Sequence, residues 1–297
     1  LENLENLKKL QSNKDESNIV GYKDLALKVY NELFPKSLKG FLQDELIIIP
    51  EGPLTLLSFA SLVKIDKSAA SFCDLEYLIY EHDVHYLASD QLLSSMTDRK
   101  LDLTSASVFA FTSAETLKEV PTKLAELPYA TREVNLIKSH FKSINEFSGF
   151  KSTSANLNAC LSTEHNFVHI ATHGSSNEND IHDLKLFTHS LDGQLDSLYT
   201  YEFMELNTPA KIIYVSSCQT GSGGINSFEG IFNLKRYLTI AGAESVITSI
   251  WNLDDFSSYR LVEGFLDNEY DLNQAQRNFI KDNSEICHPY YWAGVTN

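Results

Sequence analysis

The sequence has few basic residues and no long apolar segment. Lys and Arg number 24 against 40 for Asp and Glu, which leaves a formal net charge of −16. Such a surface repels the phosphates of nucleic acids and anionic lipids, so we expect neither direct nucleic-acid binding nor membrane binding. The apolar runs, such as 46–49, are far shorter than the roughly 18 residues of a membrane span, and no signal-peptide pattern opens the chain. These absences favour a cytoplasmic protein.

Cysteine is also scarce and lacks the spacing of a metal or disulfide motif. The four cysteines form no Cys-x-x-Cys pair and lie far apart, at Cys73, Cys160, Cys218 and Cys287. This pattern argues against a zinc ribbon and against the disulfide framework of a small secreted domain. We therefore expect four free thiols, with no metal and no organic cofactor.

The chain is long enough for one large domain or two small ones. Its 297 residues are 43% hydrophobic and 22% charged, close to the average for globular proteins. Leu1, Leu4, Leu7 and Leu10 recur every three residues, which suits one face of a helix. We expect an N-terminal helical segment at residues 1–35, the main domain at 36–297, and a chain that is a fragment of something longer.

Strand and helix patterns alternate along the main domain. Short β-branched and apolar runs predict strands, and amphipathic runs between them predict helices. The predicted strands are 45–49, 107–111, 143–147, 167–172, 211–216 and 245–250, with a strand pair at 77–87. The predicted helices are 22–33, 128–141, 227–240 and 255–266. This alternation predicts an α/β fold with a largely parallel sheet.

Two of the predicted strands end in residues that carry chemistry. Residues 167–172 lead into His173 and Gly174, and residues 212–216 lead into Cys218. In parallel sheets, ligands gather beyond the carboxyl ends of the strands. A cysteine attacks a carbonyl as a thiolate, which needs a nearby base, and His173 is the natural one. We expect both residues on exposed loops, with the polar stretch 175–183 as a loop able to move.

Other interpretations of the same residues fit less well. His165, His169 and His173 recur every four residues, but their β-branched context favours a strand, which would separate His169 from His173 by about 13 Å. We expect His169 in the core and His182 and His189 in solvent.

The glycine-rich stretch 221–224 lacks the Lys-Ser or Lys-Thr of a P-loop, and position 224 lacks the arginine of a phosphatase loop.

Two adjacent carboxylates precede the last predicted helix of this pattern. Asp254 and Asp255 follow strand 245–250, so one of them suits the N-cap of helix 255–266. A carboxylate at this place would also suit a pocket that selects a substrate Lys or Arg. The two roles are compatible with each other.

An ordered series of motifs resembles the CHAT family, caspase-related cysteine peptidases often fused to tetratricopeptide repeats. The resemblance runs from Leu46 to Trp292. Its segments are 48–54 (IIPEGPL), 171–174 (ATHG), 216–221 (SSCQTG), 228–230 (FEG), 241–246 (AGAESV), 249–255 (SIWNLDD) and 288–292 (HPYYW).

The resemblance implies a caspase-like α/β sandwich with His173 as general base or acid and Cys218 as nucleophile. It implies an oxyanion hole formed by the backbone N–H groups of Gly174 and Cys218. Family members resemble separase, in which an aspartate four residues after a tryptophan favours a basic residue before the scissile bond. Asp255 has that spacing from Trp251, although the neighbouring Asp254 is also a candidate.

The implied partner is a protein substrate, cleaved in a bacterial defence or regulated-death pathway. An activating partner or an N-terminal repeat domain is also implied, because the leading helix fits the last turns of a repeat solenoid. The competing interpretation is a latent or non-catalytic caspase-like scaffold that needs a partner for activation.

Overall fold

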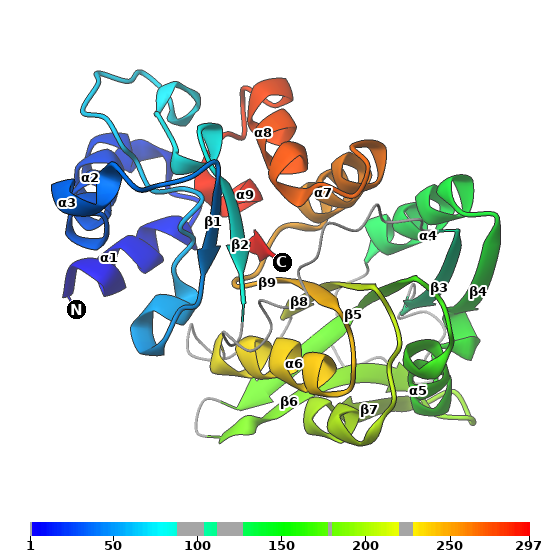
Figure 1. Cartoon of the computed structure of the whole chain (residues 1–297). Coiled ribbons are helices and arrows are strands. Elements are labelled where there is room, and N and C mark those ends of the chain that lie inside the picture. The colour runs from blue at the N-terminus through cyan, green and yellow to red at the C-terminus, as the bar shows by residue number, and fades with distance from the viewer. Residues whose placement is uncertain (1, 88–103, 112–126, 178–179, 220–227) are drawn as a thin grey trace. The chain divides into compact units, whose positions relative to one another are not determined.

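A computed structural model describes residues 2–87, 104–111, 127–177, 180–219 and 228–297 of the chain (Figure 1). It divides into two compact units. Unit 1 comprises residues 1–94 and 260–297, and unit 2 comprises residues 95–259. Among the described residues, no helix is long and apolar enough to cross a membrane.

Unit 1 combines the N-terminal helices with the C-terminal ones. Gln11, at the end of the first helix, is buried, and its Nε2 donates to Ser58 O and Ser61 Oγ, both at 2.9 Å. β1 and β2 form a two-stranded parallel sheet. The elements of this unit are α1 (Glu2–Gln11), α2 (Ile19–Leu33), α3 (Lys36–Lys39), β1 (Glu45–Ile48), β2 (Asp83–Tyr86), α8 (Leu272–Asp282), α9 (Pro289–Trp292) and β10 (Val295–Thr296).

Unit 2 is built on a parallel sheet with strand order β9-β8-β5-β3-β4. β6 pairs antiparallel with β5, and β7 pairs antiparallel with β6. The strands are β3 (Ser105–Ala110), β4 (Ser143–Ser148), β5 (Phe167–Asn177), β6 (Asp180–His189), β7 (Leu195–Tyr199), β8 (Ile212–Gln219) and β9 (Ser245–Ser249). The helices are α4 (Pro128–His140), α5 (Ser154–Ser162), α6 (Phe228–Ile240) and the first turn of α7 (Asp255–Asp267), which continues into unit 1.

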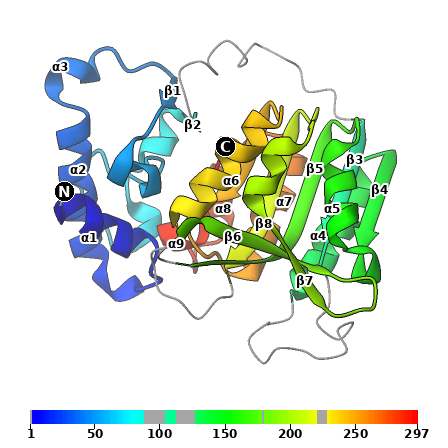
Figure 2. The same cartoon turned by 90° about the horizontal axis from the view of Figure 1, so that it is seen from below.

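Helices cover both faces of this sheet. Side chains alternate along a strand, so Val168 and Ile170 face α5 and α6 in an apolar core, while Phe167 and His169 face α4. Figure 2 shows α5 and α6 on one face of the sheet. The predicted α/β fold with a largely parallel sheet flanked by helices is confirmed.

Two local predictions were wrong, and a third falls on residues that the structure does not describe. The stretch 77–87 holds a 3-10 turn (Leu78–Tyr80) and one strand, β2, instead of a strand pair. The described part of 175–183 belongs to β5 and β6, whose antiparallel pairing gives polar residues backbone partners that a sequence pattern does not reveal. The glycine-rich stretch 221–224 lies outside the described residues.

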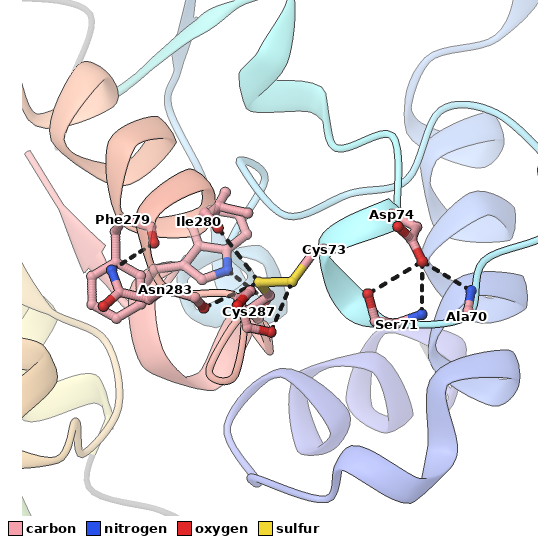
Figure 3. The surroundings of a disulfide bond; sticks show 10 residues. Ala70, Ser71, Cys73, Asp74, Phe279, Ile280, Asn283 and Cys287 are labelled. Carbon is pink, nitrogen blue, oxygen red and sulfur yellow. Dashed lines mark hydrogen bonds between the residues drawn. A yellow bond between two sulfur atoms is a disulfide. The ribbon is translucent and has the colours of Figure 1, made fainter.

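The expectation of four free thiols was also wrong. Cys73 and Cys287 form a disulfide within unit 1 (Figure 3), although 214 positions separate them in sequence. The carbonyl oxygens of Ile280 and Asn283 lie 3.4 and 3.3 Å from Cys287 Sγ. A disulfide sulfur carries no proton, so these are contacts rather than hydrogen bonds. Cys160 is a free, buried thiol, and burial raises its pKa to about 12.

Candidate active site

Strands β5 and β8 bring His173 and Cys218 to adjacent backbone positions. The two strands pair in parallel, and His173 stands directly opposite Cys218 in the register. Neighbouring strands lie about 4.8 Å apart, which is close enough for a histidine and a cysteine to act together. Runs of valine, isoleucine and aromatic residues make both segments strands. The structure therefore places the backbones of the two residues that the sequence singled out side by side, while the side chain of Cys218 lies outside the described residues.

His173 lies inside strand β5 and not on an exposed loop. Its exposed fraction is only 1%, which corrects the expectation of a solvent-facing loop. The ring of Phe111 packs edge-on against the imidazole, with centroids 6.1 Å apart. The backbone N–H of Phe111 donates to Ala171 O at 2.8 Å, so β5 itself fixes where this ring sits.

His189, expected in solvent, is buried and also packs against Phe111. The two rings stack with centroids 4.5 Å apart, and His189 Nδ1 lies 2.8 Å from Ser152 Oγ. Burial lowers the pKa of His189. The expectation failed because β6 carries His189 into the interior, and the polar stretch before it did not look like a strand. The side chain of His182 lies outside the described residues.

Gly174 continues strand β5 one position after His173. It stands opposite Gln219 of β8 and Leu186 of β6. A Cβ at this position would lie 3.5 Å from Lys185 O and 3.7 Å from Leu186 Cδ2, which is ordinary contact. The fold around Gly174 therefore has room for a methyl group.

Asp254 and Asp255 make different contacts at the start of α7. Asp254 caps the helix, since its Oδ1 accepts from the backbone N–H of Ser257 at 3.1 Å and its Oδ2 accepts from the Ser257 hydroxyl. Asp255 Oδ2 accepts from the backbone N–H of Tyr129 at 2.9 Å, in the first turn of α4. Leu127, the N-cap residue just before α4, has no side chain able to make this bond.

The carboxyl group of Asp255 lies in a partly buried, acidic environment. Burial raises its pKa above the usual value, and the negative charges of Glu133 and Asp254 raise it further, while the bond from Tyr129 opposes the shift. Aromatic rings surround the same turn, because Tyr129 packs against Phe256 and Tyr259 with centroids 5.7 and 5.6 Å away.

Sequence reasoning missed a buried carboxylate, Glu133, which lies on α4 one turn after Tyr129 and close to Ser258 of α7. The exposed fraction of Glu133 is 1%. Oε2 lies 2.9 Å from Nε2 of the buried His169, and Oε1 accepts from Ser216 Oγ at 3.0 Å. Ser216 Oγ also lies 2.7 Å from Ser258 Oγ of α7. His169 is thus a core residue, as expected.

A signal for Glu133 was present in the sequence. Helix α4 buries Ala130, Val134 and Ile137, and helical spacing puts position 133 on the same face. An acidic residue within an apolar stripe needs an internal partner. Among the described residues, no group of three or more histidine, cysteine, aspartate or glutamate side chains could hold a metal ion.

Comparisons with known proteins agree with this architecture. The family model described as "CHAT domain" matches residues 23–297. No curated protein matches the chain.

Two solved structures align with this chain over most of its length. The complex of Porphyromonas gingivalis RgpB pro- and mature domains aligns at TM-score 0.50 and 9% identity, covering 100% of this chain and 75% of that one. The crystal structure of the Arg specific cysteine proteinase gingipain R (RGPB) aligns at TM-score 0.49 and 9% identity, covering 92% and 67%. At this identity the RgpB complex shows a shared fold alone.

The fold defines an α/β protein with a largely parallel sheet flanked by helices, as in the RgpB complex. The match over residues 23–297 identifies the family, and the chain belongs to the CHAT domain family.

Proposed function

We propose that this protein is a cysteine endopeptidase that cleaves a protein substrate after a basic residue. The observation that carries the proposal is the register of β5 and β8, which sets His173 opposite Cys218 in a CHAT domain. A histidine and a cysteine on neighbouring strand ends supply the base and the nucleophile of acyl transfer.

In the proposed reaction, His173 takes the proton of the Cys218 thiol, and the thiolate attacks the peptide carbonyl carbon. The oxyanion is stabilised by the backbone N–H groups of Gly174 and Cys218. The tetrahedral intermediate collapses to a thioester, and His173 gives its proton to the leaving amine. Water then attacks the thioester with His173 as base, which releases the acid product and restores the thiol.

Asp255 is the proposed acid of the substrate pocket. Its Oδ2 is held by Tyr129 N–H, which orients the carboxyl group at the start of α7. Asp254 is committed to capping α7 through Ser257, which favours Asp255 over its neighbour for contact with substrate. An Arg or Lys side chain would form a charge-assisted hydrogen bond with this carboxylate.

A latent enzyme is the second candidate, and the burial of His173 favours it. A histidine with 1% exposure meets a substrate only after its surroundings open. A partner protein or a repeat domain that binds this chain would then be the activator.

Electrophilic peptide probes that carry Arg, Asp or Leu at the reactive end test both candidates. We expect Cys218 to be labelled, with Arg the preferred residue, and labelling to be lost in His173→Ala and in Cys218→Ala. Peptide mass mapping locates the adduct. An unlabelled Cys218 with a folded protein would favour the latent state, and equal labelling of Cys160 would contradict an assembled site.

A further inference from the structure

The two helices that meet at Asp255 are linked a second time, through the buried carboxylate of Glu133. Glu133 lies one helical turn after Tyr129 on α4, and Ser258 lies three residues after Asp255 on α7. Tyr129 N–H donates to Asp255, and Ser258 Oγ lies 3.5 Å from Glu133 Oε1. The first turns of α4 and α7 are therefore connected at two levels.

The same carboxylate reaches both strands of the proposed dyad. Through Oε2 it contacts His169, four residues before His173 on β5. Through Oε1 it accepts from Ser216, two residues before Cys218 on β8. Ser216 is in turn 2.7 Å from Ser258, which closes the connection to α7.

Because Glu133 and its partners are buried, the loss of one of these hydrogen bonds is costly. Glu133 and His169 are 1% and 0% exposed, so water does not replace a missing partner. A buried carboxylate is tolerated only where hydrogen-bond donors surround it. The donors here come from two strands and one helix, so their positions are coupled through Glu133.

We propose that Glu133 is a positioning residue that holds the first turn of α7, and with it Asp255, in place relative to the strands of His173 and Cys218. The inference rests on the proposed function for its link to substrate selection. Glu133 touches neither substrate nor reacting atoms in this proposal. The negative charge of Glu133 also acts on Asp255, whose pKa it helps to raise.

Two variants of the full chain test this role. Glu133→Gln replaces one accepting carboxylate oxygen with an NH2 group that only donates, so either His169 or the serines must change from hydrogen-bond donor to acceptor. Ser258→Ala disconnects α7 without changing any charge. The matched control is Glu146→Gln. Glu146 lies on β4 and pairs with Lys138 in the last turn of α4, so this variant removes a carboxylate that contacts α4 far from the first turn of that helix.

The first readout is the ratio of kcat/KM for peptides with Arg and with citrulline, its uncharged analogue, before the scissile bond. We expect both variants to lower this ratio between about tenfold and a hundredfold, because displacement of a binding group costs this much. Reaction of Cys218 with iodoacetamide should stay within about twofold of the wild type, since the nucleophile itself is not removed. The control should retain the wild-type ratio.

The second readout needs no activity. Hydrogen exchange at the Tyr129 amide reports its bond to Asp255, and we expect faster exchange in both variants and no change in the control. If the wild type cleaves nothing, the active peptidase is contradicted in favour of the latent state, while exchange still tests the positioning role. A wild-type ratio and wild-type exchange at Tyr129 in Ser258→Ala, even with lower thermal stability, would overturn the inference.

Discussion

At the scale of single residues, the sequence was most informative where side chains follow strand ends. His173 and Cys218 could be paired from sequence because parallel strands end at the same edge of a sheet. The sequence could not predict that His173 stands directly opposite Cys218, since this register depends on the pairing between β5 and β8. Glu133 was missed because its partners, His169 and Ser216, lie on other elements.

The ionised carboxyl group of Asp255 should lower the stability of the folded protein, although it is the proposed group that selects a basic substrate residue. Its pKa is raised in the folded state by burial and by Glu133 and Asp254. Above its unfolded pKa of about 3.9, ionisation therefore favours unfolding. Asp255→Asn keeps an oxygen for Tyr129 N–H, so we expect a higher unfolding midpoint than the wild type at pH 7 and equal midpoints as the pH falls to about 4.

Asp255→Asn should also lower the preference for Arg over citrulline. Loss of a bond to a charged group corresponds to about tenfold to a hundredfold in kcat/KM. In the wild type, that preference should decline as the pH falls through the raised pKa of Asp255, because the protonated acid no longer attracts a cation. A variant that is less stable at pH 7, or equally selective, would contradict this assignment.

Gly174 should matter for turnover and little for folding. A methyl group there meets only ordinary contacts, so Gly174→Ala should change the free energy of unfolding by less than about 1 kcal/mol. If a substrate carbonyl approaches this backbone, the added Cβ should lower kcat/KM by about tenfold or more. Chemical denaturation and peptide cleavage measured on the same sample separate the two effects. Full activity would show that the carbonyl binds elsewhere.

At the scale of elements, the periodicity of apolar residues predicted most helices and strands, but it did not predict which strands pair with each other. The predicted helix 128–141 appears as α4, which begins at Pro128 and ends at His140. The hairpin of β5 and β6 was not foreseen, because its polar residues owe their strand conformation to hydrogen bonding with each other. Helix α8 escaped notice, although its N-cap Asp271 accepts from Gln274 N–H.

The cap of α7 separates the roles of the two adjacent aspartates. Asp254→Ala removes the acceptor for Ser257 N–H, and we expect it to cost about 1 kcal/mol of stability. Asp254→Ser restores a capping oxygen without the charge, so stability should recover. Both variants should keep the preference for Arg if Asp255 is the pocket acid. Loss of that preference in Asp254→Ser would move the role to Asp254.

At the scale of the whole molecule, the disulfide joins distant parts of the sequence. Cys73 lies in the turn Phe72–Asp74, and Cys287 precedes α9, whose Trp292 Nε1 donates to Cys287 O at 3.0 Å. His288 packs on Phe72 with centroids 4.2 Å apart. No local pattern marks such a pair, because folding alone brings the two segments of unit 1 together.

Reduction of this bond should destabilise the protein. Closing a loop of this length restricts the unfolded chain, which corresponds to about 3–5 kcal/mol. We expect the urea midpoint to fall on addition of a dithiol reductant, and Cys73→Ser with Cys287→Ser to behave like the reduced protein. The double variant should no longer respond to the reductant. An unchanged midpoint in the wild type would show that the pair is reduced from the outset.

The same bond governs how proteolysis of this chain would be detected. Any cut between residues 73 and 287 leaves two fragments that remain covalently joined through Cys73 and Cys287. Under non-reducing conditions, a denaturing gel would show no fragment released by such a cut. Self-processing or cleavage by another protease would become visible only on a reducing gel, so the two gels must be compared before the chain is judged intact.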